Sequence, residues 1–148
     1  MDVADITSLD LTFINVEGAS KKRVLENAAG LIARQFPEFT TNELFDSLIS
    51  REKLGSTAIG KGVAIPHCRS KHCTRTIGTL LKLQEAVDFD AIDHEPVDLI
   101  FIMLVPDEAT EEHLQLLSQI AQRFSDEAIR DSMRSALDKE SLFQRFIG

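Results

Sequence analysis

The most restrictive feature of the sequence is an unbroken apolar run at residues 99–105. A strand with one solvated face alternates polar and apolar side chains, so a nearly continuous apolar strand over residues 97–105 predicts burial on both faces. Such burial requires a layer of structure on each side of the sheet. The run is also far shorter than the about 20 residues that span a bilayer, so we expect no membrane insertion.

Helix signals flank two amphipathic stretches in the first half of the chain. Ser20 can cap a helix that Pro37 ends. Thr40 and Glu43 have the spacing of a capping box before a second helix, which Gly55 can terminate.

The other predicted elements follow from period-two and helical patterns. They are strands at residues 11–16, 63–66, 77–83 and 97–105, and three helices that occupy the chain after Pro106. The order β-α-α-β-β-β-α-α-α predicts an α/β fold, a three-layer α/β/α domain with a central mixed β-sheet. A length of 148 residues fits a single domain over residues 1–148.

Charge is unevenly distributed along the chain. The formal net charge is −8, and most of such a surface would repel a polyanion, so we expect no nucleic-acid partner. Residues 51–82, in contrast, hold seven basic residues and one acidic residue. This segment predicts attraction to an anion or an acidic partner surface, the alternative being a chance grouping on a solvated face.

The N-terminus and the cysteines bear on the cellular compartment. The first residues are acidic and lack the basic region and apolar core of a secretory signal, which favours a cytoplasmic protein. Cys68 and Cys73 are too few for a disulfide scaffold, so we expect free thiols, whose roles stay open.

The glycine-rich stretch at residues 55–62 nearly matches a nucleotide-binding P-loop. Gly62 stands where that loop requires a hydroxyl group for magnesium, and helical sequence precedes the stretch where a strand is required. Nucleotide binding is therefore not expected. Flexible backbone with free amide groups can still form a concavity that holds an anion.

His67 follows this stretch, with basic residues just after it, and three interpretations compete. The ring can be a histidine without a task. It can belong to a metal site with Cys68, His72 and Cys73, but the spacing matches no zinc pattern and the nearby cations oppose a divalent ion, so we expect no metal. It can also be a nucleophilic imidazole that accepts a phosphoryl group, which positive surroundings favour.

Residues 51–67 resemble the phosphohistidine signature of the fructose- and mannitol-type enzyme IIA proteins of the bacterial phosphoenolpyruvate phosphotransferase system. Within this family the chain is most similar to the nitrogen-regulatory IIA branch. Further similar segments lie at residues 20–23, 89–93, 96–99, 105–106 and 113–114. The chain departs from the signature at Ala58, Lys61 and Cys68, where glycine, asparagine, and glycine or alanine are usual.

The resemblance implies roles for three residues. His67 matches the phosphorylated histidine, His113 the second active-site histidine, and Arg51 the arginine beside the site. A phosphorylated histidine carrier protein would be the donor, and the free amides near residues 60–62 would help Arg51 to neutralise the phosphoryl charge. Regulatory target proteins would then distinguish the two phosphorylation states. No cofactor is implied.

Two other functions stay open. A sugar-specific IIA component would pass the phosphoryl group on to a IIB domain. A non-catalytic module would bind an anion or a protein through the same basic loop without covalent chemistry. His113 also recurs with Leu116 and Ile120 at helical spacing, which without the resemblance fits a core histidine better.

Overall fold

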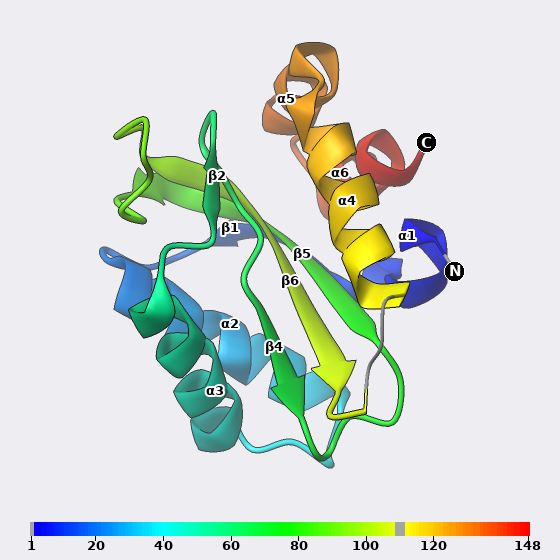
Figure 1. Ribbon diagram of the computed structural model, residues 1–148. Helices are drawn as coiled ribbons and strands as arrows, with labels where there is room; N and C mark the ends of the chain where they lie inside the picture. The colour runs from blue at the N-terminus through cyan, green and yellow to red at the C-terminus, as the bar shows by residue number, and fades with distance from the viewer. Residues whose placement is uncertain (1, 109–111) are drawn as a thin grey trace.

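A computed structural model describes residues 2–108 and 112–148, and it shows a β-sheet between two layers of helices (Figure 1). Its elements, in chain order, are α1 (Val3–Ile6), the 3₁₀ helix η1 (Leu9–Leu11), β1 (Thr12–Val16), α2 (Lys21–Gln35), α3 (Thr41–Leu54), β2 (Ala58–Gly60), β3 (Val63–Ala64), β4 (His67–Ser70), β5 (Ile77–Val87), β6 (Val97–Pro106), α4 (Glu112–Ser125), α5 (Glu127–Arg134) and α6 (Lys139–Ile147). The strands follow the order β1-β5-β6-β3-β2, and β4 also pairs with β6. Since β5 is antiparallel to β6 while β3 and β4 are parallel to it, the sheet is mixed, as predicted.

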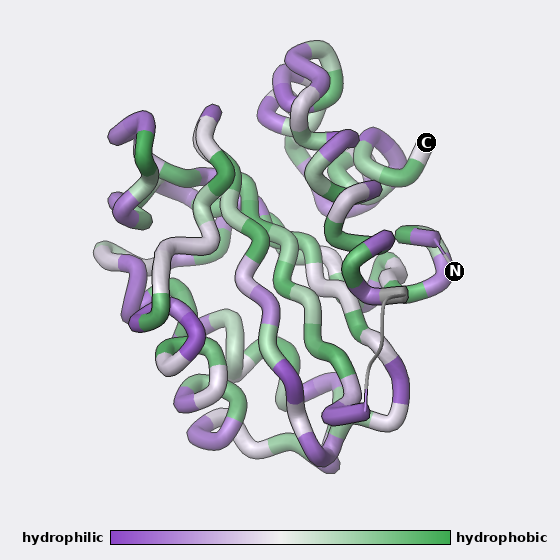
Figure 2. Tube along the Cα trace, viewed as in Figure 1, coloured by the Kyte–Doolittle hydropathy of each residue, from purple (hydrophilic) through white to green (hydrophobic). Residues whose placement is uncertain are grey.

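Strand β6 contributes to both hydrophobic cores, which explains its unbroken apolar sequence. Ile100 and Ile102 pack in the core under α2 and α3, whereas Phe101 and Met103 pack in the core under α1, α4, α5 and α6. Figure 2 shows the apolar colour concentrated along the central strands and on the helix faces turned toward them. The predicted three-layer α/β/α architecture is confirmed.

The predicted helix ends agree with the structure. The Ser20 side chain accepts a hydrogen bond from the backbone N–H of Arg23 at 3.2 Å, and Thr40 accepts one from the N–H of Glu43 at 3.2 Å. These bonds satisfy backbone donors that the first turn of a helix leaves unpaired. Gly55 ends α3 with a φ of 155°, a conformation open to glycine but rarely to other residues.

The predicted element order is incomplete, because the structure adds the short elements α1, β2 and β4 as well as η1. Elements of three or four residues are too short to show a periodic pattern of their own. The strand predicted at residues 63–66 ends at Ala64, because Pro66 has no N–H for the ladder. Helix also does not follow Pro106 directly: this residue ends β6, and α4 begins at Glu112.

Candidate active site

The three predicted site residues line one cavity of about 410 Å³. His67 is the first residue of β4, Arg51 lies in the last turn of α3, and His113 lies in the first turn of α4. The other lining residues are Ser47, Ser50, Leu54, Cys68, Arg69 and Val105. The cavity therefore lies where α3, β4, the end of β6 and α4 approach one another.

A break between β3 and β4, the two short strands that pair with the same side of β6, determines how the His67 ring is held. Strand β3 ends at Ala64 and β4 begins at His67, and both pair with β6. In the gap, the Ile65 carbonyl lies 2.8 Å from Nδ1 of His67. A carbonyl oxygen can only accept a hydrogen bond, so Nδ1 carries the proton. In the neutral ring, Nε2 then keeps its lone pair.

Two guanidinium groups lie in the cavity, and each is tied to a backbone carbonyl. Arg51 donates from Nη1 to the Gly55 carbonyl at 2.9 Å, which satisfies a group at the C-terminal end of α3. Arg69 donates from Nη1 to the Asp107 carbonyl at 2.5 Å. Because a guanidinium has five N–H donors in a planar fork, the bond to Gly55 orients Arg51 and leaves other donors for an anion.

His113 lies at the boundary between the cavity and the second core. Leu116 and Ile120, on the same face of α4, are buried, but His113 is half-buried and lines the cavity. The structure therefore does not make it a core histidine.

Comparison with known proteins identifies the family. The family model described as "Phosphoenolpyruvate-dependent sugar phosphotransferase system, EIIA 2" matches residues 5–147. The chain belongs to this enzyme IIA family. It is therefore a phosphotransferase component, in keeping with the family resemblance of residues 51–67.

Relatives at higher identity share one description. The "Nitrogen regulatory protein" of Pseudomonas aeruginosa is 53% identical over 133 residues, which cover 90% of this IIA chain and 86% of the relative. The crystal structure of "Nitrogen Regulatory Protein IIA-Ntr" from Neisseria meningitidis matches with a TM-score of 0.90 and 40% identity, covering 97% of this chain and 98% of that one.

A more distant match shows the fold alone. The structure described as a complex of enzyme IIAMTL and phosphorylated enzyme IIBMTL from Escherichia coli matches with a TM-score of 0.76 and 17% identity. The match covers 95% of this IIA chain and 98% of that one.

Sequence reasoning missed three residues of the IIA cavity that α3 contributes, Ser47, Ser50 and Leu54. Helical spacing could have found two of them. Ser47 lies four residues before Arg51 and Leu54 three residues after it, so the three side chains share one face of the helix. Leu54 is 84% exposed, so the rim of the cavity is partly apolar.

The expectation that amides near residues 60–62 meet the phosphoryl group is wrong. Gly60 ends β2, Lys61 and Gly62 form the turn to β3, and the Lys61 N–H donates to the Asp93 carboxylate at 2.8 Å. Lys61 and Gly62 line a different cavity, together with Asp98 and Arg134. The Lys61 N–H holds the pKa of Asp93 below its ordinary value, because this bond stabilises the charged carboxylate.

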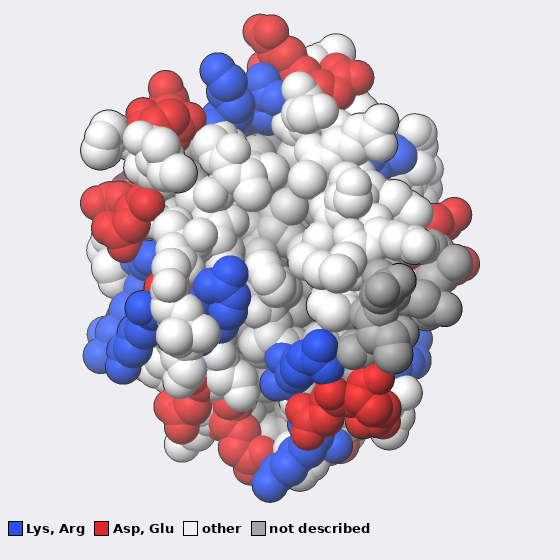
Figure 3. Space-filling view, viewed as in Figure 1, with Lys and Arg blue, Asp and Glu red and all other residues white. Residues whose placement is uncertain are grey.

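The basic segment at residues 51–82 does not form one patch. Lys82 donates to the carbonyls of Arg134 and Ala136 at the end of α5, and Arg75 lies over the ring of Phe36. Figure 3 shows Lys and Arg side chains in separate groups on the viewed face. Of this segment's basic residues, Arg51 and Arg69 line the cavity of His67.

The other candidate ligands are distributed over different environments. His72 pairs with Glu43 at 3.0 Å, and within residues 2–108 and 112–148 no three His, Cys, Asp or Glu side chains are grouped to hold a metal ion. Cys68 and Cys73 are free thiols. Burial, followed by the neighbouring Cys73, raises the pKa of Cys68 to about 12, and burial raises the pKa of Cys73 to about 11.

No helix of the described chain is long and apolar enough to cross a membrane.

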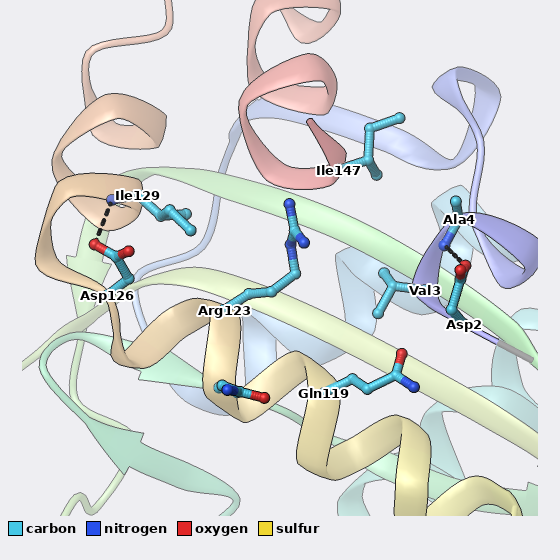
Figure 4. A pocket seen from close by; sticks show the side chains of 9 residues that line it. Asp2, Val3, Ala4, Gln119, Arg123, Asp126, Ile129 and Ile147 are labelled. Carbon is cyan, nitrogen blue, oxygen red and sulfur yellow. Dashed lines mark hydrogen bonds between the residues drawn. The ribbon is translucent and has the colours of Figure 1, made fainter.

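A second cavity, of about 500 Å³, lies among α1, α4, α5 and α6 (Figure 4). Its cation, Arg123, donates to the carbonyls of Phe146 and Gly148 and so fastens the C-terminal helix. Asp126 and Asp2 accept backbone hydrogen bonds at the starts of α5 and α1. The polar groups named here serve the helix ends, and none of the three predicted site residues lies in this cavity.

Proposed function

We propose that this IIA chain accepts a phosphoryl group on Nε2 of His67 from a phosphorylated histidine carrier protein. The observation that carries the proposal is the 2.8 Å contact between Nδ1 of His67 and the Ile65 carbonyl, beside a cavity that holds Arg51 and His113. The contact requires a proton on Nδ1, so the lone pair needed for attack is on Nε2.

The transfer exchanges one nitrogen–phosphorus bond for another. Nε2 of His67 attacks phosphorus while the bond to the carrier's imidazole breaks, and the electron pair returns to the carrier ring. Positive charge that develops on the His67 ring is stabilised at Nδ1–H by the Ile65 carbonyl. The guanidinium of Arg51 and the ring of His113 stabilise the phosphoryl oxygens. Catalysis therefore comes from the positioning of the reacting groups and from electrostatic stabilisation of the charges that develop.

Regulation would follow from the change of charge. A phosphoryl group adds about −1.5 to −2 charges at neutral pH, by analogy with other phosphorylated side chains, and here it would offset the two arginines of the cavity. Target proteins that contact the cavity rim would then bind one state in preference to the other. The shared description of the relatives supports nitrogen regulation as the process.

The proposal treats residues 1–148 as one domain that works in the cytoplasm. The unbroken contribution of β6 to both cores supports a single domain. The cytoplasm is supported by the metabolic origin of the phosphoryl group, because phosphoenolpyruvate is made there. Transfer onward to a IIB domain is the second candidate function, which the match to the mannitol complex supports at the level of the fold.

The test is phosphorylation in a purified system. The native protein is incubated with phosphoenolpyruvate, the upstream phosphotransferases and the histidine carrier, and acid-labile phosphate is located by mass spectrometry. We expect one phosphoryl group on His67, none on His67→Ala, and normal labelling of His72→Ala, which alters a half-buried histidine that is paired with Glu43 and does not line the cavity. Absence of label on the native protein, or label on His67→Ala, would contradict the proposal.

A chase experiment separates the two candidate functions. Labelled protein is mixed with purified IIB domains of the fructose and mannitol types. Retention of the label supports a regulatory endpoint, whereas rapid transfer to a IIB domain supports sugar uptake. A protein that is never labelled but binds phosphate reversibly would instead be the non-catalytic module.

A further inference from the structure

A buried carboxylate next to the cavity has no part in the transfer described above. Glu52 follows Arg51 on α3, and its side chain is only 2% exposed. It accepts hydrogen bonds from the backbone N–H of Thr57 at 3.3 and 3.4 Å, and from the Thr57 hydroxyl group. Lys21 pairs with it at 3.1 Å. Burying a charged group without partners is costly, so the buried carboxylate of Glu52 depends on all of these contacts.

The contacts of Glu52 continue along the backbone to His67. The Thr57 carbonyl accepts the N–H of Ile65 at 3.0 Å. The carbonyl of the same Ile65 accepts the Nδ1–H of His67 at 2.8 Å. The carboxylate of Glu52 is therefore connected to the reactive ring through two residues, Thr57 and Ile65.

The sequence around the break between β3 and β4 explains why the Ile65 carbonyl depends on Thr57 for its position. Ile65 lies in the gap between β3 and β4, and its N–H bonds to Thr57 rather than to β6. Pro66 has no N–H, while its carbonyl accepts the N–H of Met103 in β6. The Ile65 carbonyl therefore lies between two fixed points. The N–H of Ile65 is bonded to Thr57, and the carbonyl of the next residue, Pro66, is bonded to β6.

We infer that Glu52, acting through Thr57, is a positioning residue that keeps the His67 ring in the Nδ1–H tautomer and so makes Nε2 the reactive nitrogen. The inference rests on the proposed function for its consequence, but the tautomer itself is a property of the unphosphorylated protein. If Thr57 shifts, the Ile65 carbonyl turns away from Nδ1. The ring then samples both tautomers and loses its fixed direction.

Further contacts connect Lys21 and Ser56 to the segment that precedes β6. Lys21 also pairs with Asp90 at 2.8 Å, and the Ser56 hydroxyl donates to the Phe89 carbonyl at 2.5 Å. Residues 55–57 are therefore connected to the segment that precedes β6 as well as to α3. These contacts give Thr57 a single position, which a positioning role requires.

The decisive variant is Thr57→Val, which removes the hydroxyl group and keeps the shape of the side chain. Thr57→Ser restores the hydroxyl group and serves as the rescue. Thr79→Val is the matched control, because Thr79 is also buried and its hydroxyl group has no hydrogen-bond partner among the described residues. Glu52→Gln tests the carboxylate itself, and Thr57→Val decides the question if Glu52→Gln fails to fold.

The primary measurement is nitrogen-15 NMR of the His67 ring in the unphosphorylated protein at a pH where the ring is neutral. We expect the Nδ1–H tautomer in the native protein, in Thr57→Ser and in Thr79→Val, and a mixture in Thr57→Val and Glu52→Gln. The rate of phosphorylation by the carrier should fall about tenfold to a hundredfold in the last two, by analogy with the loss seen when a group that orients a metal-binding histidine is removed. The isomer of phosphohistidine should become mixed.

The possible results distinguish a failure of this inference from a failure of the proposed function. If Thr57→Val keeps the native tautomer and rate and only unfolds at a lower temperature, Glu52 and Thr57 are structural and the inference is overturned. A mixture of tautomers in the native protein overturns it as well. If the tautomer responds as expected but the carrier never phosphorylates the native protein, the positioning role stands and the proposed function fails.

Discussion

At the scale of single residues, Arg51 has a structural role and, in the proposed transfer, a chemical one. Its bond to the Gly55 carbonyl ends α3 and at the same time holds the guanidinium in the cavity of His67. A lysine at this position has one compact ammonium group and cannot reproduce the planar fork. In the proposed transfer, we therefore expect the geometry of the guanidinium to matter more than its charge alone.

We predict that Arg51→Gln slows phosphorylation by the carrier about a hundredfold, the typical effect of removing one preorganised donor to a developing anion. Arg51→Lys should recover only part of the rate. The measurement is single-turnover transfer from the phosphorylated carrier, followed by mass spectrometry. Arg34→Gln, which removes an equal charge from exposed surface at the end of α2, is the control. Equal rates in Arg51→Gln and Arg34→Gln would show that Arg51 has no special role.

Cys68 provides a second prediction at this scale. With a pKa of about 12, only roughly one thiol in 10⁴ is ionised at pH 8, compared with about one in ten for a thiol of pKa 9. Alkylation of Cys68 by iodoacetamide should therefore be more than a hundredfold slower in the native protein than in urea. Peptide mapping measures the rate. Rapid modification of the folded protein would show that this half-buried thiol is ionised, contrary to its raised pKa.

At the scale of elements, the most informative feature is the interrupted strand line formed by β3 and β4, which both pair with β6. Its interruption at Ile65 and Pro66 releases one carbonyl from the sheet, and that carbonyl orients the His67 ring. The turn between β2 and β3, which precedes this interruption in the chain, differs because its backbone N–H already has a partner. The N–H of Lys61 in this turn is bonded to the Asp93 carboxylate, so it is not available to hold an anion.

Two glycines in different elements should respond in opposite ways to alanine. Gly62 has a φ of +79°, and a Cβ there would lie 2.5 Å from Nη2 of Arg134, so Gly62→Ala should destabilise the protein by about 1–3 kcal/mol. Gly30 lies within α2, where a Cβ would meet only the Thr41 methyl at 3.9 Å. Gly30→Ala should stabilise it by about 0.5–1 kcal/mol. Urea unfolding measures both, and a change of the same sign in the two variants would contradict the prediction.

At the scale of the whole molecule, Lys21 links three separate regions. It lies at the start of α2 and pairs with Glu52 of α3 and with Asp90, which precedes β6. Burial opposes the charge on Lys21, but hydrogen bonds to Asp90 and Glu52 outweigh it, so its pKa is raised above the ordinary 10.5. The stabilisation from a raised pKa is complete below the unfolded value and is lost as the pH rises through the folded value.

We therefore predict that the free energy of unfolding of the native protein falls more steeply above pH 10.5 than that of Lys21→Met. The difference between the two proteins should be constant near neutral pH and should shrink in the alkaline range. Lys22→Met, at an exposed neighbouring position, should parallel the native protein. Urea unfolding at a series of pH values measures this, and a difference between native and Lys21→Met that does not change with pH would contradict it.

Long elements were predictable from the sequence, and short ones were not. The caps at Ser20 and Thr40 and the apolar β6 were all found where local patterns indicated them. The strands β2 and β4 were missed because their pairing partners, rather than their own residues, make them strands. In the candidate site, His67 and Arg51 share one signature, but His113 was implied only by the resemblance. The Lys61 amide was misjudged because its partner, Asp93, lies 32 residues further along the chain.

The sequence by itself determined the helix ends, the strand that is buried on both faces, and the family to which residues 51–67 are similar, because each depends on residues within a few positions of one another. Only the tertiary structure decided that Arg51, His67 and His113 line one cavity, that most of the basic segment lies elsewhere, and that Nδ1 of His67 meets the Ile65 carbonyl. These contacts join α3, β4 and α4, whose relative positions depend on strand register and on packing against β6. No local pattern contains that information.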